Sequence, residues 1–151
     1  MAQGTVEWFD EALYQMALGT FNLETDVIKL ALVDSTTTPL TTTAVPHWGG
    51  TGTTDFSTWQ VATAGSYTGP VTLANNTVAL SAGVINIDWH DPAAWAANAS
   101  NDTDTRWGII YDDTDTSKRC LGWVDLGSSF DHTTGTLTIV FGTPAATLNQ
   151  A

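Results

Sequence analysis

The chain has 151 residues, of which sixteen are Asp or Glu and four are Lys or Arg, so its formal net charge at pH 7 is -12. This charge repels nucleic acid and anionic membrane surfaces, which argues against either as a partner. Seven Trp residues and a hydrophobic content of 42% argue against disorder, because a chain of this length can bury a core without covalent staples. We expect one folded, acidic domain over residues 1–151.

The first predicted element is a helix over residues 6–18. Apolar residues, Phe9 and Leu13 among them, recur there at helical spacing, and acidic residues lie near its amino end. Thr5 is the expected N-cap and Gly19 the expected stop. We expect the apolar stripe to pack on a sheet; the alternative is that it docks onto a neighbouring subunit.

The rest of the chain has a β pattern, with the β core predicted over residues 26–142. Strands are expected at 26–33, 71–74, 77–81, 84–89, 105–111, 120–127 and 136–141, with a further strand or turn at 61–67. Residues 34–58 are rich in Thr, Pro and Gly and are expected to form a long surface loop, a kind of segment that often binds or moves. Asn75 and Asn76 tolerate positive φ and predict a tight hairpin between two of these strands.

The clearest β signal is the pair of apolar runs at 105–111 and 120–127, joined by an acidic connector with turn chemistry. Trp107 and Trp123 within them are expected in the core. Cys120 is the only cysteine, so it cannot form an internal disulfide, and its apolar surroundings predict a small buried hydrophobic residue. Short strands after one leading helix predict an all-β fold, either an antiparallel β-sandwich or a jelly-roll-like barrel with one short N-terminal helix.

The sequence contains no arrangement typical of catalysis. His47, His90 and His132 lie far apart in loop-like contexts without metal-ligand spacing, and we expect them to be solvated or locally hydrogen-bonded. No nucleophile elbow of the pattern G-x-S-x-G occurs. No local feature would raise the pKa of one strand-end carboxyl against another. We expect no enzymatic activity, cofactor or metal, with a small hydrolase as the weakest alternative.

Two acidic stretches, 102–104 and 112–115, raise a calcium hypothesis, since Ca²⁺ binds several oxygen ligands. Neither stretch completes an EF-hand loop, because the central Gly and the closing Glu are missing. We therefore interpret both as solvated turns.

The remaining tryptophans allow two interpretations. Trp48 and Trp59 lie in or beside the long loop, and Trp95 follows a strand-ending Asp-Pro step. Exposed aromatic side chains on a β-sandwich can stack on sugar rings, so a carbohydrate-binding adhesin is an alternative function. The favoured interpretation is that they cover the ends of the core, and Trp89, at the end of a predicted strand, is expected within it.

Several short blocks follow one another in a recognisable order. They are 18–23 and 25–33 after the leading helix, a Gly-Tyr turn at 65–69, the predicted hairpin at 71–80, Asp88-Trp89, 106–113, 121–127 and 137–141. Read together, these blocks resemble a group of small virion proteins encoded by tailed bacteriophages. The resemblance spans nearly the whole chain, departs at an enlarged loop over 49–59, and carries no catalytic residues. It implies a structural component of the virion, made in the host cytoplasm.

Charge favours the capsid exterior for such a component, because a chain at -12 is poorly placed against packaged DNA. We therefore predict a capsid decoration (cement) protein that binds the major capsid protein and copies of itself as a symmetric oligomer. A tail or fibre-associated protein and a glycan-binding adhesin remain alternatives. The predicted partner-binding residues are Phe9, Leu13, Trp48, Trp59 and Trp95.

Overall fold

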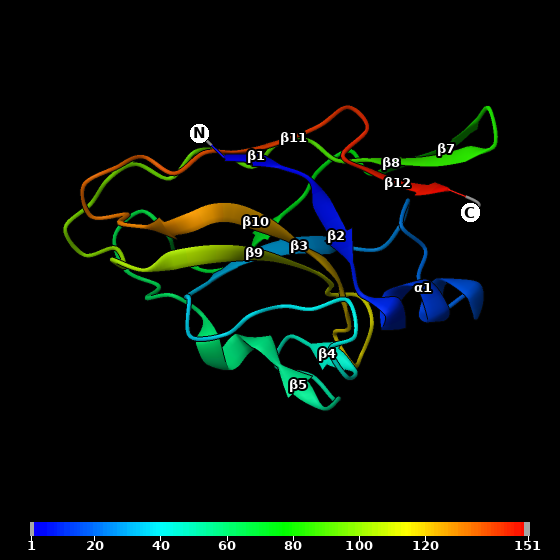
Figure 1. The fold of residues 1–151 in the computed structure, drawn as a ribbon, viewed down its shortest axis with the longest axis horizontal. Helices are drawn as coiled ribbons and strands as arrows, with labels where there is room; N and C mark the ends of the chain where they lie inside the picture. The colour runs from blue at the N-terminus through cyan, green and yellow to red at the C-terminus, as the bar shows by residue number, and fades with distance from the viewer. Residues whose placement is uncertain (1, 150–151) are drawn as a thin grey trace.

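The computed structural model describes residues 2–149 (Figure 1). Its single α-helix is α1 (Asp10–Ala17), and a short 3-10 helix, η1, spans Phe56–Trp59. Its strands are β1 (Ala2–Gly4), β2 (Val6–Trp8), β3 (Ile28–Val33), β4 (Pro46–His47), β5 (Thr54–Asp55), β6 (Val71–Thr72), β7 (Thr77–Ser81), β8 (Val84–Asp88), β9 (Thr105–Asp112), β10 (Cys120–Phe130), β11 (Ile139–Phe141) and β12 (Ala146–Asn149). The fold is all-β and sandwich-like, as predicted. Strand pairing within residues 2–149 does not close it into a barrel.

The central layer is a five-stranded antiparallel sheet in the order β2-β10-β9-β3-β6. The predicted hairpin is its centre: Ile109 of β9 pairs with Trp123 of β10 on one side and with Ala31 of β3 on the other. Nearly every residue of β9 is buried, because both faces of this sheet are covered. A continuous apolar run, rather than an alternating one, is the pattern that such a strand requires.

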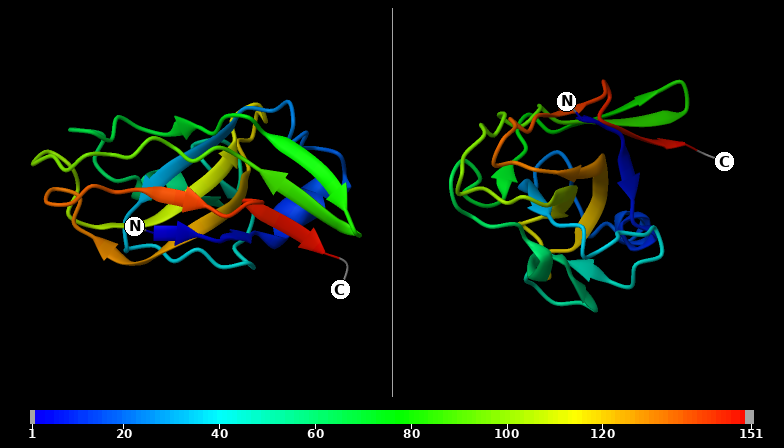
Figure 2. Two further views of the ribbon diagram at one scale, coloured as in Figure 1. Left: turned by 90° about the horizontal axis from the view of Figure 1, so that it is seen from above. Right: turned by 60° about the vertical axis from the view of Figure 1, so that its left-hand side comes forward.

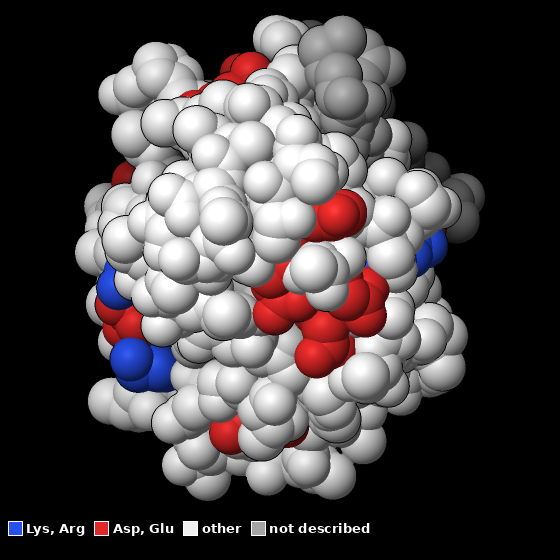
Figure 3. All heavy atoms as spheres, turned by 90° about the vertical axis from the view of Figure 1, so that its left-hand side faces the viewer, with Lys and Arg blue, Asp and Glu red and all other residues white. Residues whose placement is uncertain are grey.

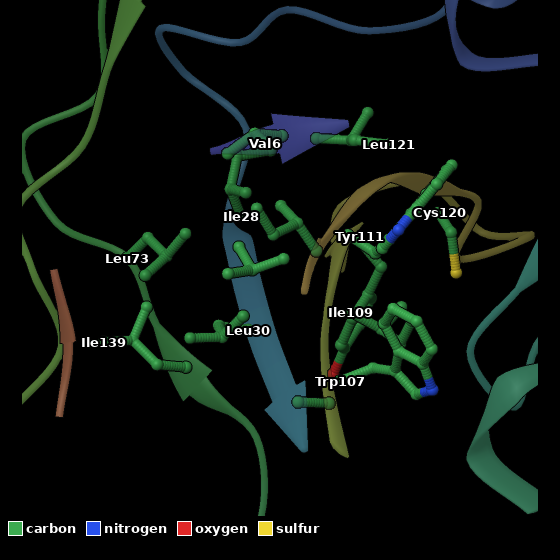
Figure 4. Close-up of a cluster of buried hydrophobic side chains, with 14 of the residues drawn as sticks. Val6, Ile28, Leu30, Leu73, Trp107, Ile109, Tyr111, Cys120, Leu121 and Ile139 are labelled. Carbon is green, nitrogen blue, oxygen red and sulfur yellow. The ribbon is translucent and has the colours of Figure 1, made fainter. Parts of the chain in front are cut away.

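Each face of the central sheet packs against a different part of the chain. Figure 4 shows Leu30 beside Leu73 and Ile139 on one side of β3, while Trp107 and Ile109 extend to the other side. The first side faces the layer that contains the parallel pair β1–β11, drawn above the central sheet in Figure 1. The second side faces the segment between β3 and β6, whose carbonyl at Thr37 accepts a hydrogen bond from Nε1 of Trp107 at 2.9 Å.

A three-stranded antiparallel sheet, β12-β8-β7, continues the upper layer. Its β7–β8 hairpin turns at Ala82 and Gly83, both with positive φ (50° and 81°), as a tight two-residue hairpin turn requires. The hairpin extends beyond the central sheet at the end of the molecule where α1 lies (Figures 1 and 2).

The predicted helix over 6–18 is correct only in its second part. Its first three residues form β2 instead, where the neighbouring β10 supplies hydrogen-bond partners for the backbone. The helix consequently starts later, with Phe9 at the N-cap position and no side-chain cap, so the prediction of Thr5 as N-cap is wrong. Gly19 is confirmed as the stop: its φ is 74° and its N–H donates to the carbonyl of Met16 at 3.0 Å.

The predicted hairpin at Asn75 and Asn76 is also wrong. β6 pairs with β3 in the central sheet and β7 pairs with β8 in the other layer, so the chain passes between sheets at this point. Asn75 does adopt the positive φ of a turn residue, at 53°, but it lies in the segment that crosses between the two sheets and not in a hairpin. Of the strand or turn expected at 61–67, the structure has the turn, at residues 65–66, and no strand. β12 lies beyond the predicted β core of 26–142.

Candidate functional site

Three of the five predicted partner-binding residues belong to the core. Phe9 is completely buried, with its ring centroid 4.7 Å from that of Trp123. Trp48 is stacked on Tyr111 at 5.4 Å and is 6% exposed. Trp95 is 5% exposed. The prediction that Phe9, Trp48 and Trp95 contact a partner is therefore wrong, because these side chains have almost no solvent-exposed surface.

Trp59 and Leu13 differ from those three residues. Trp59 is partly buried and packs edge-on against Phe56. Leu13 is 40% exposed on α1, so among the five it presents the clearest free surface. The favoured interpretation of the loop tryptophans as a cover for the core is confirmed for Trp48. Residues 34–58 lie at the surface as expected, with about half of them exposed, and the buried side chains among them pack on the core.

The core assignments from sequence are confirmed for the other aromatic residues and the cysteine. Trp89, Trp107 and Trp123 are all buried. Cys120 is buried on β10, and burial raises the pKa of its thiol well above the ordinary value. A thiol held in its neutral form here is a packing residue rather than a nucleophile.

Among the hydrogen bonds of residues 2–149, one contact joins a serine side chain to a histidine ring, that of Ser66 with His132. Nε2 of His132 lies 3.5 Å from Oγ of Ser66 and 3.0 Å from the carbonyl oxygen of Trp95. A carbonyl only accepts, so this nitrogen carries the proton and cannot act as a base toward the serine. The serine hydroxyl itself donates to the carbonyl of Ala96 at 2.6 Å.

Asn101 completes this network rather than a catalytic triad. Its buried amide donates to Oγ of Ser66 and to the carbonyls of Ala96 and His132, at 3.0 to 3.1 Å. These hydrogen bonds hold three separate loops together, although Nδ1 of the buried His132 ring has no hydrogen-bond partner. We interpret the cluster as a structural junction. The sequence predicts histidines that are solvated or locally hydrogen-bonded. His132 is hydrogen-bonded, but its ring is fully buried and therefore not solvated.

The two acidic stretches are hydrogen-bonded turns. Oδ1 of Asp112 accepts from the N–H groups of Thr114 and Asp115, at 2.8 and 3.1 Å. Asp102 and Asp104 accept hydrogen bonds from neighbouring loop backbone. Between residues 2 and 149 no group of three or more His, Cys, Asp or Glu side chains is arranged to hold a metal ion.

Asp112 departs from the expected solvated turn, because its side chain is completely buried. Its Oδ2 has no hydrogen-bond partner. Burial, with a smaller contribution from the nearby carboxyl of Asp26, raises the pKa of Asp112 to about 6. The stability of the fold is therefore expected to depend on pH through this buried carboxyl.

All four basic residues of the chain are paired with carboxylates. The pairs are Lys29 and Lys118 with Asp113, Arg106 with Asp125, and Arg119 with Asp115. Hydrogen bonding to Lys29 lowers the pKa of Asp113, and hydrogen bonding to Arg106 lowers that of Asp125. The surface therefore presents unneutralised carboxylates but no unneutralised Lys or Arg.

Five of the seven large apolar side chains that are exposed in the described part of the chain lie at one end of the molecule, which we call the apolar end; the other two are Val27 and Leu40. The apolar end comprises Leu13, Tyr14 and Leu18 on or next to α1, and Leu80 and Ile85 on the β7–β8 hairpin, with exposed fractions between 38% and 76%. Sequence reasoning found only Leu13 among them. The others occur in ordinary amphipathic patterns, and their exposure depends on where the hairpin and helix lie in the fold.

An open groove of about 410 Å³ lies within the apolar end, between the segment after α1 and the three-stranded sheet. We call it the hairpin groove. Met16, Phe21, Leu23, Ile85, Ile87 and Leu148 contribute its apolar lining, and Glu24 is the charged residue that lines it. Its volume falls in the range of sites that bind small molecules or a few side chains of a partner.

Comparison with known proteins gives no relative: no family model, curated protein or solved structure matches the chain. The described helices are all too short or too polar to cross a membrane.

Proposed function

We propose that the protein is a non-enzymatic structural component of a tailed-bacteriophage virion, and specifically a decoration protein on the outer face of the capsid. Its partners would be the major capsid protein and further copies of itself. The observation that carries the proposal is the distribution of large apolar side chains. All aromatic side chains except Tyr14 are buried in the core or packed against it, and five of the seven exposed large apolar side chains lie at one end. That distribution suits a rigid body that adheres through one surface.

Charge supports the capsid exterior. Figure 3 shows carboxylates gathered on the face opposite α1, with Lys and Arg only toward the margins of the view. Such a face is compatible with solvent outside a shell and would be repelled by packaged DNA inside it. The resemblance of the sequence to small virion proteins supports the same class of function.

The tryptophans that the adhesin alternative would use to contact a glycan are covered by other parts of the chain. Trp48 and Trp95 are buried and Trp59 is partly covered, so these residues form no aromatic platform for a sugar. A tail or fibre-associated protein would use the same fold elsewhere on the particle. Copy number separates that alternative from the proposal.

The test is to count copies of the protein in purified virions of the phage that encodes it, by quantitative gel or mass spectrometry. A decoration protein should be present in hundreds of copies, in a fixed ratio to the capsid subunit. A few copies in fixed ratio to tail subunits would favour the tail alternative. Absence from the particle would refute both.

A further inference from the structure

We propose that the hairpin groove is the docking site for an extended segment of the partner that carries large apolar side chains flanked by Lys or Arg. The inference rests on the proposed function and deepens it, since it names the surface that contacts the capsid protein and the chemistry of the capsid segment. Three features of the groove support it: an apolar sheet face that extends past the body, a preformed opposite wall, and a rim that carries the exposed carboxylate of Glu24.

The first feature is the apolar face of the β7–β8 hairpin. Val78 pairs with Ile87 and Leu80 with Ile85, so these four side chains share one face of the sheet. Ile87, next to the body, is 1% exposed, whereas Ile85 is 38% and Leu80 is 76% exposed. The outer half of an apolar face is thus without a cover in the isolated chain. Burying it against a partner would be favourable by about 25 cal/mol for each Å² removed from water.

The second feature is the opposite wall, which is held in place before any partner arrives. Thr20 donates through its N–H to the carbonyl of Gln15 at 3.0 Å and through Oγ1 to Oε1 of the same residue at 2.7 Å. The carbonyl of Asn22 accepts from the N–H groups of Thr25 and Asp26. A wall fixed in this way loses little conformational entropy on binding, which favours affinity.

The third feature is charge, and it decides between possible occupants. Glu24 is exposed at the groove, and the basic residues of the chain are all paired with other carboxylates. A second copy of this chain would bring another body of charge -12 against that rim. Lys or Arg beside the apolar residues of a different protein would neutralise it instead. We therefore assign the groove to a basic and apolar capsid segment rather than to self-association.

The experiment compares two pairs of variants for binding to capsid shells from particles that lack the protein. Ile85→Thr removes apolar surface from the groove, and Val84→Thr makes a similar change on the opposite face of the same strand. Glu24→Lys reverses the rim charge, and Glu7→Lys is the same substitution at an exposed position on β2. Ile85→Thr and Glu24→Lys should each weaken binding about tenfold or more, which corresponds to about 1.4 kcal/mol. The two controls should bind like the unaltered chain.

The possible outcomes are distinct. Equal binding by all variants with unchanged urea midpoints would overturn the groove assignment and leave the proposed function intact. Failure of the unaltered protein to bind shells would overturn the proposed function and the docking site with it. A solution dimer that Ile85→Thr dissociates, with shell binding unchanged, would show that the groove is a contact between copies and would also overturn the assignment.

Discussion

Replacement of Asp112 by Asn should make the protein more stable at neutral pH. Asp112 is completely buried at the end of β9, and Oδ2 has no hydrogen-bond partner. Asn retains an oxygen that can accept from the N–H groups of Thr114 and Asp115, as Oδ1 does now. It removes the ionisable group whose charged form is disfavoured by burial.

The magnitude follows from the raised pKa. The Asp112 carboxyl has a pKa of about 6 in the fold against an ordinary 3.8, so the folded chain holds this proton more tightly than the unfolded chain. Its stabilising contribution is therefore complete below pH 3.8 and is lost as the pH rises through 6. The full loss is about 3 kcal/mol, at about 1.4 kcal/mol per pH unit of difference. Asp112→Asn has no such loss, so its advantage over the unaltered chain should grow as the pH rises from about 4 to 6 and level off above about pH 7.

Urea unfolding followed by tryptophan fluorescence at several pH values measures this difference. Asp113→Asn is the matched control, because the pKa of Asp113 is lowered by hydrogen bonding to Lys29. A group with a lowered pKa stabilises the fold above its ordinary pKa, so this variant should be less stable at neutral pH, with the opposite sign. If the stability difference between Asp112→Asn and the unaltered chain does not change with pH, the explanation of the buried carboxyl is wrong.

Two further substitutions test the packing. Trp48→Ala should lower the free energy of unfolding by about 3 to 5 kcal/mol, since the ring is buried against Tyr111; unchanged stability with loss of glycan binding would instead support the adhesin alternative. Gly122→Ala should cost about 1 to 3 kcal/mol in a thermal melt, because its Cβ would lie 2.2 Å from the carbonyl oxygen of Glu7. A silent Gly122→Ala would contradict the close pairing of β2 with β10.

The parts of the fold that sequence predicts well are those whose signal is contained within each strand. β9 and β10 are long apolar runs joined by turn residues, and their pairing needs no information from elsewhere. Trp107 and Trp123 lie within those runs and are buried as expected. Gly19 ends α1 through its own conformational freedom, again a local property.

The elements that sequence reasoning misses depend on distant partners. Val6–Trp8 matches the helical spacing of the residues that follow it, yet it forms a strand because β10 supplies its hydrogen bonds. Asn75 has the residue type of a hairpin turn, but β6 and β7 join different sheets. Short strands carry too little pattern of their own for their pairing to be read from one segment.

The candidate site was less predictable than the fold. Trp48 lies in the surface segment that composition predicts, but its side chain turns inward and stacks on Tyr111, a contact that the local sequence does not indicate. The hairpin groove exists because the three-stranded sheet extends past the body opposite Phe21 and Leu23. Ile85 has the same alternating pattern as the buried Ile87, and only the tertiary arrangement leaves it exposed.

The most direct test of the proposed role is electron cryo-microscopy of virions with and without the gene for this chain. The account predicts regular density on the outside of the capsid at symmetry-related positions, with α1 and the β7–β8 hairpin facing the shell, and its complete loss when the gene is deleted. Density confined to the tail, or capsids that are identical in the two samples, would contradict it.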